Sequence, residues 1–144
     1  MLEVAAAIRL LALRADLSRG PVLSTSESVV AYLDALIGRA TVETVHLLYL
    51  DTQNCLISDE TLSVGTIDEA LVSPRVILRR GLELNAVGLV LAHNHPSGDA
   101  APSIADSSAT RRLAAAARPL DIHLLDHIIV ARGKWTSYRL EGWL

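Results

Sequence analysis

Two histidines and one aspartate between residues 92 and 106 have the types and the spacing of a metal site. His93 and His95 lie two residues apart at the end of a short apolar run that predicts a strand. Side chains two residues apart in a strand point to the same face, so both imidazoles could reach one ion. Asp106 falls in the predicted first turn of the next helix, and the loop between could return that turn to the strand end.

Three protein ligands with one open position are typical of a catalytic zinc site rather than a structural one. The metal lowers the pKa of a water towards neutrality, and such a water needs a general base, usually a glutamate that is not a ligand. Taken alone, each part of this pattern has a simpler explanation. Ser103 and Asp106, for example, form the S-x-x-D pattern of a helix capping box. The whole combination, with Pro96, Gly98 and Pro102 between its parts, is much harder to obtain by accident.

The site must be positioned by elements that the hydrophobic pattern and the turn residues indicate. Helices are expected over 2–15, from a Ser24–Glu27 capping box to Ile37, over 74–84 behind an N-cap at Ser73, and over 103–118. Strands are expected over 44–50, 55–58, 61–64, 86–92, 122–132 and 135–140.

The run at 86–92, AVGLVLA, shows no alternation of apolar and polar residues. That is typical of a central strand buried on both faces. Helices alternate with strands along the chain, and a mixed sheet covered by helices on both sides satisfies this pattern. The sequence therefore predicts an α/β protein with three layers, α/β/α.

Composition narrows the class of protein. The 144 residues are 51% hydrophobic, which indicates one compact domain rather than disorder. The net charge of −3 makes direct nucleic-acid binding doubtful. A single cysteine, Cys55, excludes a disulfide within the chain and favours a reducing compartment. No apolar stretch is long enough to span a bilayer, so we expect a cytoplasmic protein without a membrane partner.

The motif H-x-H-P, with seven residues between the second histidine and Ser103 and then S-x-x-D, resembles the JAMM motif of the JAB/MPN metallopeptidase superfamily. The specific form HNHPSG…PS..D resembles the RadC-like branch, as do SPR at 73–75, Thr110 and LDHIIV at 125–130. The resemblance runs from about Val42 to Leu144.

This resemblance implies a cytidine-deaminase-like α/β/α fold with Zn²⁺ held by His93, His95 and Asp106. It also implies a glutamate on an early strand as general base, and Glu43 in VETVHLLYLD is the best match. Ser103 would then hydrogen-bond the developing oxyanion while it caps its helix.

Three other acidic residues are rivals for the role of the base, Glu60, Asp68 and Glu83, all less well placed than Glu43. Asp126 and His127 lie inside an apolar strand, where burial costs free energy unless both are paired. We interpret them as a satisfied polar pair at the edge of the site, with a direct chemical role as the alternative.

Two features depart from the wider superfamily. Its deubiquitinases carry Ser or Thr between the two histidines, whereas this chain has Asn94, which argues against ubiquitin-type substrates. RadC-like proteins commonly carry a longer helical N-terminal region. We therefore expect residues 1–40 to be a helical segment left from such a region and residues 41–144 to be the JAB/MPN domain. The apolar N-terminal helix could dock against a partner, which makes a homodimer possible.

The first hypothesis for function is a zinc-dependent hydrolase that cleaves a peptide or isopeptide amide in a peptide or protein substrate. The second is a non-enzymatic accessory module in DNA repair or recombination that uses the same fold for binding. A nucleobase deaminase is a third and weaker hypothesis, because the chain lacks paired cysteine ligands and an H-x-E signature.

Overall fold

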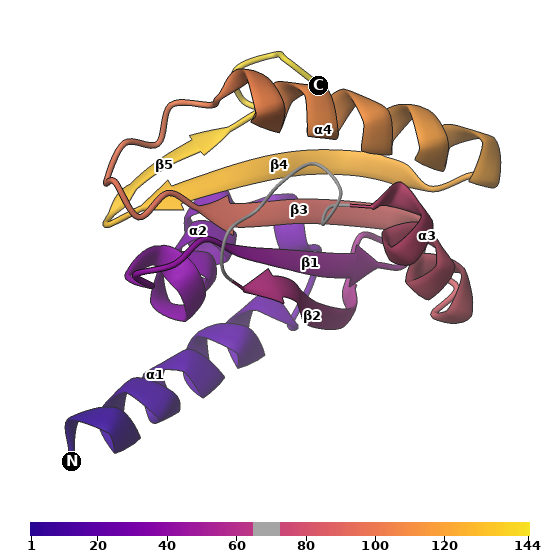
Figure 1. Cartoon of the computed structure of the whole chain (residues 1–144). Coiled ribbons are helices and arrows are strands. Elements are labelled where there is room, and N and C mark those ends of the chain that lie inside the picture. The colour runs from indigo at the N-terminus through magenta and orange to yellow at the C-terminus, as the bar shows by residue number, and fades with distance from the viewer. Residues whose placement is uncertain (65–72) are drawn as a thin grey trace.

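A five-stranded mixed sheet forms the centre of the molecule (Figure 1). The computed structural model describes residues 1–64 and 73–144. The strands are β1 (Thr44–Leu50), β2 (Leu56–Val64), β3 (Gly88–Asn94), β4 (His123–Ala131) and β5 (Lys134–Ser137), in the spatial order β2-β1-β3-β4-β5. Only β3 and β4 run parallel; the other neighbouring pairs are antiparallel.

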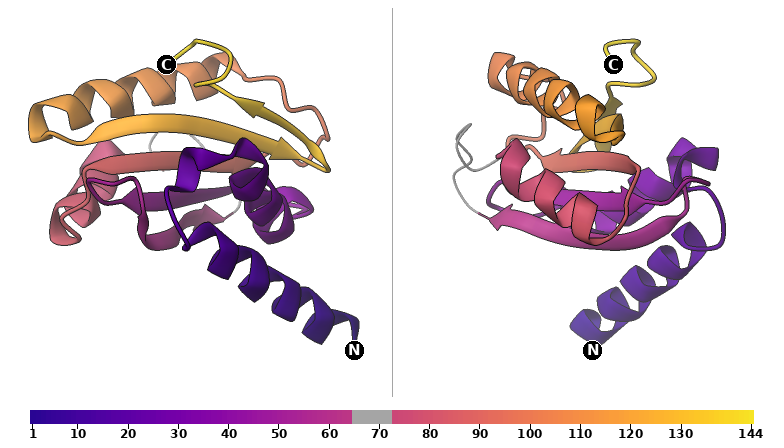
Figure 2. Two further views of the ribbon diagram at one scale, coloured as in Figure 1. Left: turned by 180° about the vertical axis from the view of Figure 1, so that it is seen from behind. Right: turned by 90° about the vertical axis from the view of Figure 1, so that its right-hand side faces the viewer.

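Helices cover both faces of this sheet. In the described part of the chain, the α-helices are α1 (Leu2–Leu17), α2 (Ser26–Leu33), α3 (Pro74–Glu83) and α4 (Ile104–Ala117), with short helical turns at Val22–Ser24, Asp34–Gly38 and Arg118–Leu120. Figure 2 shows α3 and α4 on one side of the sheet and α2 on the other, while α1 projects away from the body. The predicted three-layer α/β/α architecture with a mixed sheet is confirmed.

The two central strands, β1 and β3, are buried at every position. Alternating side chains divide them between two hydrophobic cores. On the α3 and α4 side, Val45, Leu47 and Leu91 pack in one core. On the other side, Leu48 and Val90 pack against residues of α2. The apolar run without alternation at 86–92 therefore has the physical cause expected from the sequence, which is burial on both faces.

The N-terminal part of the chain contributes to the second core. Leu17 at the end of α1 is buried there, and so are Val29 and Leu33 of α2. The first three turns of α1 leave Val4 and Ile8 more than half exposed. Helix α2 forms one layer on the sheet. The division of the chain into segments 1–40 and 41–144 stays a prediction. Within the described residues, the structure has no helix long and apolar enough to cross a membrane.

Several predicted boundaries were wrong. The strands expected at 55–58 and 61–64 form the single strand β2, because Asp59 and Glu60 between them find ion-pair partners instead of forming a turn. The N-cap of α2 is Thr25, whose hydroxyl accepts the Ser28 N–H, rather than Ser24. The strand expected to end at residue 92 runs on through Asn94.

The last strand is also shorter than the predicted range of 135–140, because β5 ends at Ser137. Just beyond it, the Arg139 N–H donates to the Asp126 carboxylate at 3.0 Å, and the Ser137 hydroxyl donates to the same group. These bonds draw the chain out of the sheet ladder.

A buried polar cluster ties α1 and α2 to the sheet. The Asp59 carboxylate on β2 accepts hydrogen bonds from His46 Nε2 at 2.8 Å, Arg14 Nε at 2.8 Å and the Tyr32 hydroxyl. The His46 and Asp59 side chains are both 5% exposed. Burial raises the pKa of Asp59, but the hydrogen bonds from His46, Tyr32 and Arg14 outweigh it and hold this pKa well below its usual range.

We expect Asp59→Asn to lower the free energy of unfolding by about 1–3 kcal/mol, because the buried donors lose a charged acceptor. A carboxyl whose pKa is lowered in the folded state stabilises the fold above its unfolded pKa of about 3.9, and this contribution is lost as pH falls towards the folded pKa. Urea unfolding between about pH 7 and pH 2 measures both effects. The wild type should lose stability more steeply than Asp59→Asn below about pH 4; parallel curves would contradict the prediction.

Candidate metal centre

His93 and His95 project together from the end of β3. His93 is the last residue but one of the strand and pairs with Val45 of β1. Their Nε2 atoms lie 2.9 Å apart, and both side chains are largely buried, at 7% and 14% exposed. The alternation of a strand thus places both rings on one face of the sheet, as the sequence predicted. This face is the one covered by α3 and α4.

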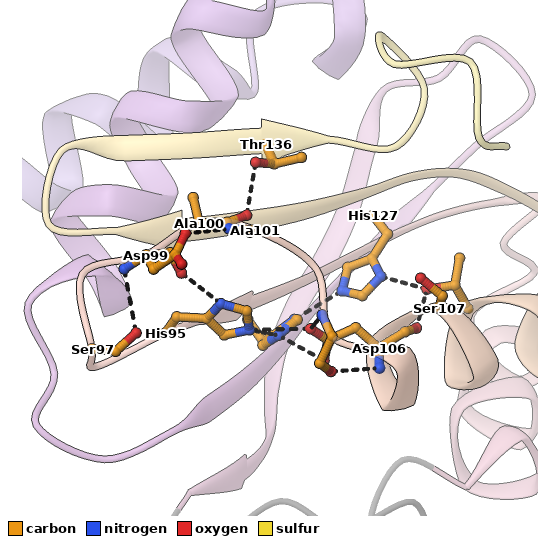
Figure 3. A network of polar contacts seen from close by, with 12 residues as sticks. His95, Ser97, Asp99, Ala100, Ala101, Asp106, Ser107, His127 and Thr136 are labelled. Atoms are coloured by element: carbon orange, nitrogen blue, oxygen red, sulfur yellow. Dashed lines mark hydrogen bonds and ion pairs between the residues drawn. The ribbon is translucent and has the colours of Figure 1, made fainter.

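Asp106 reaches these histidines from the first turn of α4 (Figure 3). Its Oδ1 lies 3.2 Å from His93 Nε2, and its Oδ2 lies 3.1 Å from His95 Nε2. The same Oδ2 accepts the Ser103 N–H at 2.8 Å, while the Ser103 hydroxyl accepts the Asp106 N–H at 3.0 Å. This capping box is reciprocal, so it fixes the position of the carboxylate as well as starting the helix.

The surroundings of Asp106 keep its side chain ionised. Burial raises the pKa of this carboxyl, but the adjacent His93 and His95 rings, together with the Ser103 N–H, outweigh that effect and hold the pKa far below its usual range. The group is therefore a carboxylate at neutral pH, which is the form that binds a metal ion.

A backbone carbonyl sets the orientation of the His95 ring. His95 Nδ1 lies 2.8 Å from the Asp99 carbonyl oxygen, which can only accept, so Nδ1 carries the proton. Asp99 is itself held by bonds to Ser97 and Ala101 (Figure 3). In the neutral ring, Nε2 is therefore a bare lone pair directed at Asp106 and His93.

The three groups form a set that could hold a metal ion, with one ligand atom of each within 4.8 Å of the others. Zinc binds imidazole nitrogen and carboxylate oxygen at about 2.0–2.2 Å, so two ligands at a tetrahedral angle lie about 3.3 Å apart. The measured separations of 2.9, 3.1 and 3.2 Å are close to that value. The donor set and its spacing therefore fit zinc.

Glu43 lies just before β1 and is half-buried. If the pairing of Val45 with His93 is continued by two residues, Glu43 stands opposite His95 on the same face of the sheet. The hydrogen bond with Asp106 is the largest cause of a raised His95 pKa, and burial of the ring opposes it. The negative charge of Glu43 also raises this pKa. Glu43 is thus within electrostatic range of the site without belonging to the group of three ligands.

The rival carboxylates have other partners. Both carboxylate oxygens of Glu60 lie 3.0 Å from Arg80 Nε and share its single hydrogen, and Glu83 lies 3.2 Å from Arg80 Nη1. Both therefore lie in an ion-pair network between β2 and α3. Asp68, the third rival, lies outside the described residues.

Asn94 connects the metal ligands to the segment that carries Glu43. Its side chain is fully buried on the opposite face from the histidines. Its Oδ1 accepts the Thr44 N–H at 2.6 Å, and its Nδ2 donates to the carbonyls of Val42 at 3.0 Å and Ala40 at 3.3 Å. The backbone on both sides of Glu43 is therefore bound to the residue between the two histidines.

Asp126 and His127 face opposite sides of β4 rather than each other. Asp126 accepts bonds from Ser137 and from the backbone N–H groups of His127 and Arg139. His127 instead places its Nε2 2.8 Å from His93 Nδ1, in direct contact with the candidate ligand. Burial first, and the nearby His93 ring second, lower the pKa of His127 well below its ordinary value, so this ring is neutral.

Sequence reasoning missed how Asn94 and Thr110 act. It used Asn94 only as a mark of the RadC-like branch and Thr110 only as a flanking part of the resemblance. A polar residue that alternates into a buried strand face needs a partner, and this signal could have identified Asn94. The contact of Thr110 with His127, at 2.6 Å, depends on how α4 lies on β4, which no local pattern contains.

Comparison with known proteins gives one family. The model of the RadC-like JAB domain matches residues 23–143. A UPF0758 protein of Vibrio atlanticus is 44% identical over 128 residues, which cover 89% of this chain and 57% of that protein. UPF0758 proteins of Photobacterium profundum and Rhodobacter capsulatus are 44% and 41% identical, over 92% and 91% of this chain and 59% and 61% of their own lengths. The chain thus spans about three-fifths of these relatives.

Proposed function

The chain belongs to the RadC-like JAB domain family, and from this premise we propose that it is a zinc-dependent hydrolase that cleaves a peptide or isopeptide amide. One observation carries the proposal. The two histidine Nε2 atoms and the Asp106 carboxylate face one another at 2.9–3.2 Å. Three electron-pair donors this close repel one another unless a proton or a metal cation lies among them.

Two imidazoles and one carboxylate leave a fourth position for water or substrate, as in catalytic zinc sites. A zinc ion bound there supplies Lewis-acid chemistry that makes water nucleophilic at neutral pH and polarises the scissile carbonyl. The remaining steps belong to side chains of the chain.

Glu43 is the general base in this proposal. It takes a proton from the attacking water as the new C–O bond forms, and it returns that proton to the nitrogen as the C–N bond breaks. The Ser103 hydroxyl accepts the Asp106 N–H through its oxygen, so its own hydrogen stays available to the oxyanion of the tetrahedral intermediate.

A cavity of about 500 Å³ lies alongside α4 and gives a peptide substrate a place to bind. Its walls are Pro102, Ser107, Thr110, Arg111, Tyr138 and Trp143. The three candidate ligands do not line this cavity, but its wall residue Thr110 contacts His127, which in turn contacts His93. The aromatic rings offer apolar contact, and Arg111 offers a positive charge for an acidic side chain or a terminal carboxylate.

Metal analysis tests the first step of the proposal. Protein purified without a chelator at neutral pH should contain about one zinc per chain, and His95→Ala should contain almost none. Amine release from a mixed peptide library then tests for hydrolysis. A wild-type protein free of metal after purification in zinc-containing buffer would contradict the proposal.

We expect Asn94→Ala to keep zinc but to lower the rate of hydrolysis by about 100-fold, because misplacing a catalytic group by about 1 Å costs that much. The loss follows from releasing the backbone on both sides of Glu43. Zinc content, kcat and amide hydrogen exchange at Thr44 measure the ligands, the chemistry and the released bond separately. In Asn94→Ala, slow amide hydrogen exchange at Thr44 together with an unchanged kcat would contradict the role given to Asn94.

A further inference from the structure

The outward nitrogen of His93 is bound by a second histidine, which is unusual for a metal ligand. His93 Nδ1 lies 2.8 Å from His127 Nε2. The His127 side chain is buried, and the Tyr138 ring stacks on it with centroids 4.8 Å apart and planes 16° apart. Each of these two imidazoles could carry its proton on either nitrogen, so the contact alone leaves the direction of the hydrogen bond open.

Thr110 fixes that direction. Its Oγ1 lies 2.6 Å from the Asp106 carbonyl oxygen and 2.6 Å from His127 Nδ1. A carbonyl oxygen cannot donate, so the single hydroxyl hydrogen of Thr110 goes to Asp106. The bond between Thr110 and His127 then requires a proton on His127 Nδ1.

The remaining assignments follow in order. With its proton on Nδ1, the neutral His127 ring has a bare Nε2, which can only accept. His93 must therefore donate from Nδ1, and its Nε2 is left as a lone pair that faces Asp106 and His95. This series of hydrogen bonds runs from the backbone carbonyl of Asp106 through Thr110 and His127 to the ring of His93.

We infer that Thr110 and His127 are positioning residues that hold His93 in the tautomer able to bind a metal ion through Nε2. The inference rests on the proposed zinc site, but the tautomers can be tested without metal. Without the Thr110 hydroxyl, His127 could carry its proton on Nε2 and donate to His93 Nδ1. His93 would then carry a proton on Nε2, the nitrogen that has to bind the ion.

The direct test is ¹⁵N–¹H NMR of the histidine rings in the metal-free wild-type protein, at about pH 8, where neutral imidazoles dominate. We expect Nδ1–H tautomers for His93 and His127 in the wild type, and a mixture of tautomers for both rings in Thr110→Val. An Nε2–H tautomer for either ring in the wild type would overturn the inference, whether or not the protein binds zinc.

Zinc affinity, measured by competition with a chelator, tests the consequence. Thr110→Val and His127→Leu should each weaken zinc binding about 10-fold to 100-fold, as loss of a partner to a metal-ligating histidine does. His127→Gln should recover part of the loss, because its amide oxygen can accept the His93 Nδ1–H. An affinity of Thr110→Val within twofold of wild type would overturn the inference.

Ser18→Ala is the control. The Ser18 hydroxyl donates to the Arg14 carbonyl four residues earlier at 2.9 Å, as the Thr110 hydroxyl does to the Asp106 carbonyl, and the neighbouring Leu17 packs in the core on the opposite face of the sheet from the histidines. Its zinc affinity and its histidine tautomers should equal those of the wild type. If the wild type itself fails to bind zinc, the proposed function fails, and the tautomers of the metal-free protein still decide the role of Thr110.

Discussion

Replacing Glu43 by glutamine is expected to lower the rate of amide hydrolysis by about 10²–10⁴-fold, the usual contribution of a general base. Glutamine keeps the size of the side chain but cannot take a proton from water. Zinc content should not change, because Glu43 is not one of the three grouped ligands. The loss should fall on kcat rather than on KM, since the carboxylate acts in the transition state.

Glu60→Gln is the control for this substitution. Glu60 is also a half-buried carboxylate, on strand β2, but it pairs with Arg80, so its loss should leave hydrolysis intact. Loss of zinc in Glu43→Gln would make Glu43 a ligand, and an unchanged kcat would remove it from the mechanism. If neither wild type nor variant cleaves any substrate and both bind DNA in a salt-dependent way, the accessory-module hypothesis is favoured instead.

The second large effect is expected at Asp106, which serves both the metal and the helix. Zinc binding is worth about 10–16 kcal/mol over four ligands, so loss of one ligand costs about 3 kcal/mol, or roughly 100-fold in Kd. Asp106→Ala also removes half of the capping box of α4, which should lower the stability of the metal-free protein by about 1 kcal/mol.

Two further variants separate these roles. Asp106→Asn keeps an oxygen that can accept the Ser103 N–H, so its metal-free stability should stay near wild type while its zinc affinity falls. Ser103→Ala removes the other half of the box and should cost about 1 kcal/mol of stability with a smaller loss of zinc affinity. Thermal unfolding of the metal-free proteins and chelator competition measure the two quantities. Full zinc affinity in Asp106→Asn would exclude this carboxylate as a ligand.

The parts of the site that the sequence could predict are those set by short-range periodicity. Residues two apart in a strand share a face, so the convergence of His93 and His95 follows from their spacing. The S-x-x-D pattern predicts the capping box that places Asp106. The buried strand at 86–92 is recognisable because both of its faces are apolar.

The parts that could not be predicted depend on contacts between distant segments. Asp59 stays inside β2 because Arg14 and Tyr32, from α1 and α2, bind it. No local signal near Asp59 indicates those partners, so the sequence predicts two strands, 55–58 and 61–64, in place of β2. The bond between Thr110 and His127 likewise joins residues 17 apart across the contact of α4 with β4.

The pairing of β1 with β3 has a consequence for how this domain can change by insertion or deletion. The position of Glu43 relative to the metal ligands is set by strand register, since Val45 is paired with His93. A slip of one residue would turn Glu43 to the opposite face of the sheet, together with every other side chain of β1. A single-residue deletion at the start of β1 should therefore silence the site more completely than many substitutions around it. Tolerated length changes should be confined to segments outside the two paired strands.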